Sequence, residues 1–207
     1  MRLELDFIIY ASLLIAALLP LYIYRKRIFR AKYSDNGFSF FIKDLKLHMS
    51  EYHPKIKIDY SIIEKTQNEL DLRVRETLIV ENIVTQFFNY KYEKRTQESI
   101  PRDKLWSNYI EKSNSNPKYP NDWTQRKEIS WKRDDKSCNR CGTKISLEAS
   151  YTCFVQDIKD GGGYNIENII ILCSDCNKVI NSTNPKNTIS SLSLNDSLMV
   201  YVKSYLI

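Results

Sequence analysis

Residues 138–177 read CNRCGTKISLEASYTCFVQDIKDGGGYNIENIIILCSDCN, with a CxxC pair at each end and 31 residues between the pairs. Four cysteines in this pattern are typical of a closed tetrahedral zinc site, in which each sulfur lies about 2.3 Å from the metal. Such a site stabilises the fold directly, because the unfolded chain does not hold the ligands together. We therefore predict a structural Zn²⁺, with two disulfides as the alternative. The predicted ligands are Cys138, Cys141, Cys173 and Cys176.

The segment between the two cysteine pairs predicts a β-hairpin that leads into a helix. Residues 151–158 and 168–172 are expected to form the two strands, and Gly161 to Gly163 provide the turn. The helix is expected to start near Cys176 and to reach residue 182. Cys153, the fifth cysteine, is interpreted as a core residue.

Composition bounds the rest of the chain. Its 207 residues suffice for one main domain with appendages, and a hydrophobic fraction of 43% with 14 Tyr and 8 Phe excludes disorder over most of the length. The net charge of +6 is mild, so it permits a nucleic-acid or anionic membrane partner without requiring one. No internal repeat is visible.

An uncharged apolar run of 18 residues, Phe7 to Tyr24, predicts a membrane anchor. As a helix it spans about 27 Å, enough for a bilayer core. Basic residues between Arg25 and Lys32 follow it, so the positive-inside rule places the chain beyond it in the cytoplasm and the N-terminus outside. A signal peptide and a buried core helix are the alternatives. Glu4 and Asp6 disfavour the first, and the lack of a polar face disfavours the second.

The middle of the chain predicts a small helical region. Apolar residues recur at helical spacing in three segments, alternation indicates one short strand, and a polar break marks the start of the C-terminal domain. His48 and His53 are interpreted as surface or packing residues. The expected helices are 38–49, 71–90 (buried stripe Leu72, Ile79, Ile83, Phe87) and 102–112, the strand is 55–60, and the break is 113–119.

These elements together predict an α+β protein: a transmembrane helix, a helical region and a zinc-stapled ββα domain. The expected parts are an anchor with its basic segment at 1–32, the helical region at 33–116, the zinc domain at 117–182, and a tail at 183–207 that packs on the zinc domain.

Motifs around the cysteines resemble those of the HNH endonuclease family. The opening Tyr119-Pro120-Asn121-Asp122-Trp123 is followed by Arg126, then by Arg133-Asp134 and by the two cysteine pairs. The resemblance covers roughly residues 119–182 and is discontinuous. It implies a ββα-metal fold, hydrolysis of DNA phosphodiesters, and a prokaryotic or phage origin.

The resemblance also implies residue roles. Family members end the first strand with a His as general base; they hold a divalent cation through the preceding residue and a His or Asn on the helix, and an Asn orients the base. Here the base position falls on Asp157, the ligand positions on Gln156 and Asn177, and the orienting Asn is Asn168. No His lies beyond residue 53. An Asp is a weaker base than a His but a better oxygen ligand for Mg²⁺ or Mn²⁺, and Asp160 would assist it as a ligand.

Three hypotheses remain open at this point. The chain is a membrane-tethered nuclease that acts on DNA, an inactive zinc module that binds nucleic acid, or a module that docks a protein partner. A basic patch around the first cysteine pair would contact phosphates in the first two cases. An ordinary solvated basic face is its alternative. The patch consists of Lys127, Lys132, Arg133, Lys136, Arg140 and Lys144.

Overall fold

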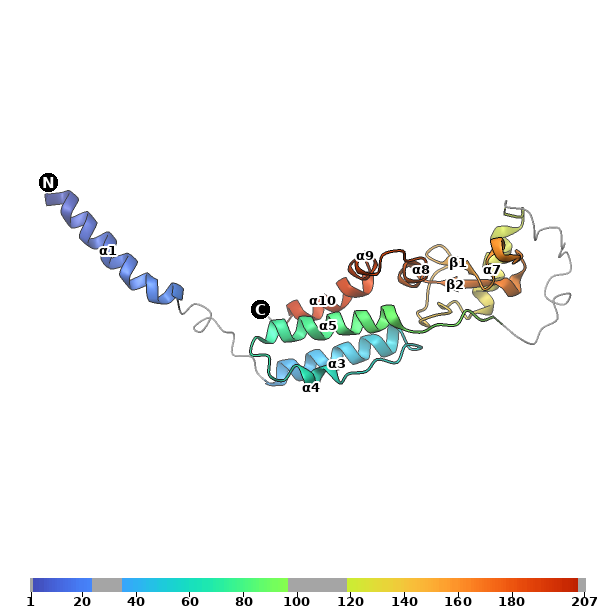
Figure 1. Cartoon of the computed structure of the whole chain (residues 1–207), viewed down its shortest axis with the longest axis horizontal. Coiled ribbons are helices and arrows are strands. Elements are labelled where there is room, and N and C mark those ends of the chain that lie inside the picture. The colour runs from blue at the N-terminus through green and yellow to red at the C-terminus, as the bar shows by residue number, and fades with distance from the viewer. Residues whose placement is uncertain (1, 24–34, 97–118, 205–207) are drawn as a thin grey trace.

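The computed structural model describes residues 2–23, 35–96 and 119–204 (Figure 1). The predicted helix at 102–112 and most of the predicted linker lie outside these residues. In the described part, helices predominate and one two-stranded sheet is present. The α+β class is therefore confirmed.

Helix α1 (Arg2–Ile23) covers the N-terminal apolar run. Several of its large apolar side chains, such as Phe7 and Leu14, are exposed. Within the described residues, no helix combines the length and the apolar character that crossing a membrane requires. The predicted span over residues 7–24 is therefore not confirmed.

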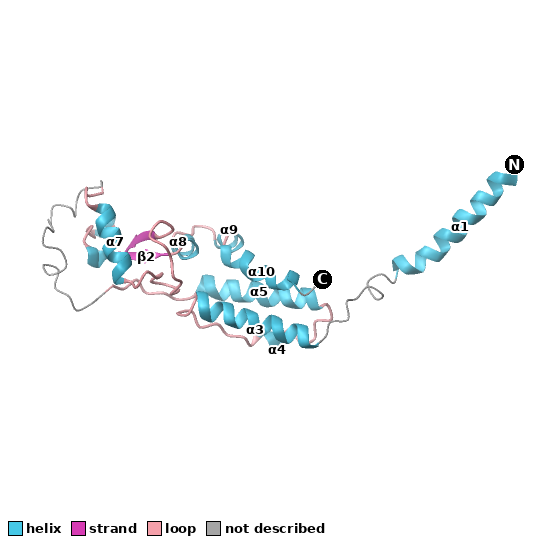
Figure 2. Ribbon diagram, turned by 180° about the vertical axis from the view of Figure 1, so that it is seen from behind, coloured by secondary structure: helices cyan, strands magenta, loops and turns pink. Residues whose placement is uncertain are grey.

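Three helices form a bundle: α3 (Asp35–Tyr52), α5 (Leu72–Asn89) and α10 (Ser193–Ser204). Helix α10 packs on both α5 and α3, as Figures 1 and 2 show. Each helix buries apolar side chains at positions i, i+4 and i+8, which share one helix face. Full burial of such a side chain contributes roughly 2 kcal/mol. The buried sets are Phe41, Leu45 and Met49; Ile79, Ile83 and Phe87; and Leu194, Leu198 and Val202.

The helices predicted at 38–49 and 71–90 are thus present, with slightly different ends. Asp71 begins α5 by accepting hydrogen bonds from the amides of Arg73 and Val74. Leu72 is only half-buried, so the buried apolar stripe begins at Ile79, about two turns later than predicted.

The predicted strand at 55–60 is wrong. This segment is extended, but among the described residues it pairs with no strand and lies outside the sheet; the short helix α4 (Ile62–Lys65) follows it. Ile56, Ile58 and Tyr60 pack on the bundle core. The backbone of Asp59 bonds instead to the side chain of Gln86 on α5. The alternation of apolar residues therefore reflects an extended chain lying on a helical surface.

The hairpin consists of β1 (Tyr151–Phe154) and β2 (Ile169–Leu172), which pair antiparallel with Tyr151 opposite Leu172 and Phe154 opposite Ile169. Its connection contains two short 3₁₀ helices, η2 (Ile158–Asp160) and η3 (Ile166–Asn168). Helix α8 (Ser174–Ile180) follows β2. The predicted hairpin and helix are thereby confirmed, with a shorter first strand than expected. Helix α7 (Trp123–Arg133), which precedes the hairpin in the chain, packs on β2 and η3.

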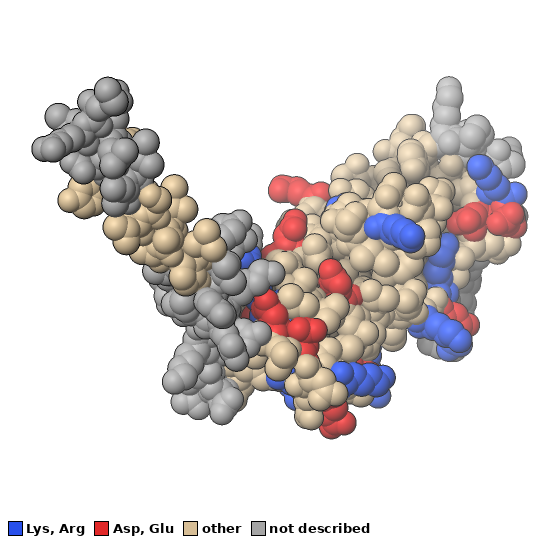
Figure 3. Space-filling view, turned by 60° about the vertical axis from the view of Figure 1, so that its left-hand side comes forward, with Lys and Arg blue, Asp and Glu red and all other residues tan. Residues whose placement is uncertain are grey.

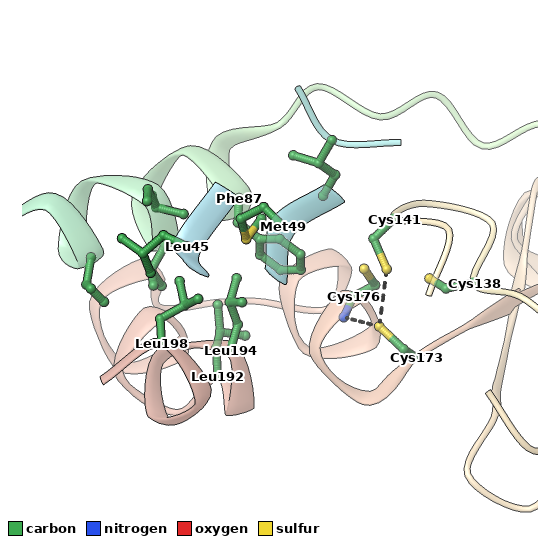
Figure 4. Close-up of a cluster of buried hydrophobic side chains, with 14 of the residues drawn as sticks. Leu45, Met49, Phe87, Cys138, Cys141, Cys173, Cys176, Leu192, Leu194 and Leu198 are labelled. Carbon is green, nitrogen blue, oxygen red and sulfur yellow. Dashed lines mark hydrogen bonds between the residues drawn. The ribbon is translucent and has the colours of Figure 1, made fainter. Parts of the chain in front are cut away.

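The bundle and the cysteine region share one core. Met49 and Phe87 lie beside the cysteines in Figure 4, and the buried cluster that contains them includes all four metal-site cysteines. Gly142 adopts a φ of 86°, and a Cβ there would meet Pro54 Cγ at 2.9 Å. The first cysteine pair is therefore docked closely against the end of α3.

The C-terminal tail divides between the two regions. Helix α9 (Pro185–Ser190) contacts α8 and α5, whereas α10 lies on the bundle. We expected the whole tail on the zinc domain; instead, the i, i+4, i+8 face of α10 completes the bundle core. Asp175 of α8 connects the two regions by accepting hydrogen bonds from the amides of Ser193 and Leu194, which begin α10.

Candidate functional site

The four predicted ligands converge at one point. The sulfurs of Cys138, Cys141, Cys173 and Cys176 all lie within 4.8 Å of one another, and all four residues are buried (Figure 4). The sulfurs of Cys141 and Cys173 are 3.7 Å apart. A tetrahedron with Zn–S bonds of 2.3 Å has S···S edges of roughly 3.8 Å. The arrangement therefore fits a structural zinc site, and all five cysteines are free rather than disulfide-bonded.

Two polar groups lie next to the sulfurs. The amide of Cys176 donates to Cys173 Sγ at 3.4 Å, and Thr143 Oγ1 lies 3.1 Å from Cys141 Sγ. Bonding to Cys138 lowers the pKa of Cys141 but raises the pKa of Cys173 and Cys176. Four thiols this close do not ionise independently, so a divalent cation is the group that would allow all of them to be thiolates.

Arg140 belongs to the first cysteine pair, and its side chain contacts both Cys176 of the second pair and the end of α5. It is 2% exposed and donates to Cys176 Sγ at 3.5 Å and to the carbonyl of Phe87 at 2.5 Å. Its guanidinium also lies over the rings of Phe87 and Tyr90. The prediction that Arg140 contacts nucleic acid is therefore wrong: the side chain is buried and bonds within the protein.

The rest of the predicted basic patch is also largely used within the protein. Arg133 donates to the carbonyls of Ile166 and Ile169 at 2.7 Å each and pairs with Asp134. Lys132 pairs with Glu128, and Lys144 with Asp135, each at 2.6 Å.

On the face shown in Figure 3, basic and acidic residues are interspersed. Among the described residues, Lys127 and Lys136 are the members of the patch without a carboxylate partner. Lys132 and Lys144 remain 61% and 68% exposed, and such surface ion pairs are weak, so Arg133 and Arg140 are the members of the patch that the fold buries.

The arginines of the opening motif hold α7 against the hairpin. Arg126 is buried, bonds both carboxylate oxygens of Asp122 at 3.0 Å, and donates to the carbonyl of Tyr164 at 2.8 Å. Trp123 lies among the rings of Tyr119, Phe154 and Tyr164. These motif residues therefore have a structural role: they support the loop between the strands.

Asn168 organises that loop. Its Oδ1 accepts from the amide of Gln156 at 2.8 Å, and its Nδ2 donates to the carbonyls of Gln156 and Gly163 at 2.9 and 2.8 Å. A Cβ on Gly162 would meet the carbonyl oxygen of Gln156 at 2.0 Å. Asn168 is buried and fully bonded, so it shapes the backbone around Asp157 and is not available as a metal ligand.

Asp157 is presented at the end of this loop. Its backbone carbonyl accepts from the amides of Asp160 and Gly162, whereas its side chain is 60% exposed. One carboxylate oxygen lies 3.7 Å from Lys94 Nζ. The sequence alone did not identify Lys94, because it precedes Tyr119, where the family motifs begin, by 25 residues.

The other predicted cation ligands, Gln156, Asp160 and Asn177, do not form a cluster of ligand atoms. Gln156 Nε2 donates to the carbonyl of Asp160, and both side chains are exposed. Asn177 lies on α8, which contacts β1, and its Oδ1 accepts from Asn181 at 3.0 Å. Within the described residues, the four cysteines are the group of three or more His, Cys, Asp or Glu side chains whose ligand atoms meet, so no second such cluster forms at Asp157.

Both histidines lie near the cysteine centre, on the side of the bundle. His53 is 7% exposed, stacks edge-on against Phe87 and lies 3.0 Å from Thr143 Oγ1. His48 Nδ1 lies 3.2 Å from the hydroxyl of Tyr201 on α10. Both line a cavity of about 420 Å³ next to Cys173. Of the two predicted alternatives, surface or packing, burial supports packing for His53, whereas His48 is only half-buried.

A hairpin that leads through a four-cysteine centre into a helix defines a ββα unit with a candidate metal site. Residues 138–183 match the family model described as HNH endonuclease, and the chain therefore carries an HNH endonuclease domain over these residues. This confirms the resemblance that the motifs indicated. Comparisons with curated proteins and with solved structures find no match.

Proposed function

We propose that this chain is a divalent-cation-dependent nuclease that hydrolyses phosphodiester bonds in DNA. The observation that carries the proposal is the exposed carboxylate of Asp157 at the base position of an HNH endonuclease domain. The loop that presents it is fixed by three hydrogen bonds of Asn168. A fixed loop with an accessible acidic side chain is what a cation site needs, because pre-organised ligands bind without further ordering.

The donor set suits a hard cation held with few protein ligands. Mg²⁺ is commonly bound by one or two carboxylates together with substrate phosphates. Asp157 would supply the main ligand, and Asp160, Gln156 and Asn177 are the residues that would assist it. A bound Mg²⁺ or Mn²⁺ would polarise the phosphoryl group. The four cysteines would hold a structural Zn²⁺ and take no part in hydrolysis.

A plasmid-nicking assay tests the proposal. Zinc-loaded protein is incubated with supercoiled DNA with and without Mg²⁺ or Mn²⁺, and Asp157→Ala is compared with Glu148→Ala. Glu148 is an exposed carboxylate in the same domain, ahead of β1, so it controls for loss of a surface charge. We expect wild type and Glu148→Ala to nick with either cation. Asp157→Ala should lose nicking by about a hundredfold or more, as removal of one catalytic group commonly does.

One observation favours a second candidate function, an inactive HNH module that binds nucleic acid. Asp157 stands where a His would act as base, and an ion pair with Lys94 already engages it. Wild-type protein that binds DNA but nicks it with neither cation would support this candidate and reject the nuclease. Stoichiometric recovery of a protein partner without nucleic acid would reject both and favour the docking module.

Membrane attachment through residues 7–24, with the C-terminal domain in the cytoplasm, stays a separate prediction. Its support is the uncharged run and the basic residues that follow it. Alkaline carbonate extraction of membranes tests it: an integral anchor keeps the chain in the pellet, and release into the supernatant rejects the span.

A further inference from the structure

Residues 90–96 form an extended strap between α5 and the cysteine domain. Its side chains alternate: Tyr92, Lys94 and Thr96 are half-buried, whereas residues 91, 93 and 95 are exposed. Successive side chains of an extended chain point to opposite sides. Tyr92, Lys94 and Thr96 therefore share one side of the strap.

Contacts on both sides of Lys94 fix the strap to the HNH domain. The Tyr92 hydroxyl donates to Asn139 Oδ1, and the Thr96 hydroxyl donates to the carbonyl of Glu167. Burial raises the pKa of Tyr92, so its hydroxyl keeps the donated proton. Because Asn139 lies in the first CxxC pair and Glu167 lies just before β2, the strap runs along the domain over the whole distance between them.

Lys94 lies between these two anchors and reaches Asp157. Its side chain is 29% exposed, and Nζ lies 3.7 Å from the carboxylate. An ion pair with a partner this exposed contributes little to stability. Packing does not explain the residue either, since an apolar side chain would serve better on the half-buried side of the strap. The position thus places a cation next to the carboxylate of the candidate site.

We propose that Lys94 is a phosphate-binding residue that contacts the DNA backbone next to Asp157. The inference rests on the proposed action on DNA. Lys94 is a flexible point charge with three donors, and a phosphate approaching Asp157 comes within its reach. The strap thereby completes the site from outside residues 138–183, the segment that matches the family model.

The test is the salt dependence of DNA binding by full-length, zinc-loaded protein without added Mg²⁺. Fluorescence anisotropy with a short labelled duplex compares wild type, Lys94→Met, Lys94→Arg and Lys91→Met. Lys91 lies on the exposed side of the same strap and is the matched control. Each phosphate contact contributes about 0.9 to the slope of log K against log salt.

We expect Lys94→Met to lower this slope by about 0.9, so that its affinity deficit shrinks about threefold between roughly 50 and 200 mM salt. Lys94→Arg should restore the slope, and Lys91→Met should match wild type. Equal slopes for Lys94→Met and Lys91→Met, or no DNA binding by wild type, overturn the inference. A changed slope in a protein that nicks no plasmid keeps Lys94 as a phosphate contact but rejects the nuclease, so the two failures are distinguishable.

Discussion

Replacement of Arg140 by Met should destabilise the protein and weaken binding of Zn²⁺ at the four cysteines without changing the proposed binding of DNA. The variant keeps the apolar stem but loses the donors to the Phe87 carbonyl and to Cys176 Sγ. Bonds from a charged donor contribute about 1.5–3 kcal/mol each, and an acceptor left buried and unpaired costs about 1–3 kcal/mol. A metal centre with four thiolates and one divalent cation also carries net negative charge that Arg140 compensates. We expect a loss of about 3 kcal/mol, or roughly 6–12 °C in Tm for a chain of this size.

Thermal unfolding followed by circular dichroism measures this change, with Lys144→Met as the control. Lys144 is exposed and pairs only with exposed Asp135, so its loss should stay within about 0.5 kcal/mol. Competition with a chromogenic chelator should show zinc affinity about 10–100-fold lower in Arg140→Met, the usual effect of removing a group that supports metal ligands. An Arg140→Met protein with wild-type Tm and zinc affinity but weakened DNA binding would contradict this structural role and assign Arg140 to the DNA-contacting surface.

Two further predictions concern the loop and the bundle. Gly162→Ala should lower the free energy of unfolding by about 1–3 kcal/mol and abolish nicking, because the Gln156 carbonyl must move away from the new Cβ. Gly161→Ala is the control: its Cβ would meet no close atom, and only its φ of 86° is unfavourable for Ala. It should lower the free energy of unfolding, measured in urea, by about 1 kcal/mol. Burial is the main cause that lowers the pKa of His48 below 6.5; the nearby His53 lowers it further, and Glu51 opposes the shift. As the pH falls below about 6.5, the unfolded state therefore binds more protons at this residue than the folded state does. Wild type should therefore lose more unfolding free energy than His48→Gln between about pH 7.5 and pH 5.5, and parallel losses would contradict this assignment.

The sequence predicted the cysteine centre and the hairpin because local patterns encode both. The CxxC pairs give the ligands directly, and Ile169–Leu172, within the predicted run 168–172, form a fully buried strand. The stripe from Ile79 to Phe87 is likewise buried as its spacing predicts. In each case the information lies within a few residues of the feature, where periodicity and spacing are strongest.

The structural features that the sequence did not predict depend on contacts between distant segments. Arg140 reads as a surface cation until the end of α5 is placed beside it, since its carbonyl partners lie about 50 residues earlier. Lys94 reaches Asp157 only because the strap follows the domain surface. The strand predicted at 55–60 failed for a related reason: an extended chain lying on helices shows the same alternation as a strand in a sheet.

Met49 and Phe87 of the bundle pack in the same buried cluster as the four cysteines. Metal binding at the cysteines would therefore be coupled to folding of the bundle as well as of the cysteine domain. Asp175 extends this coupling, because the residue just before Cys176 also caps α10. Withdrawal of zinc should then unwind helices far from the cysteines in sequence. A short fragment limited to residues 138–183 would lack the apolar surface on which those cysteines are packed.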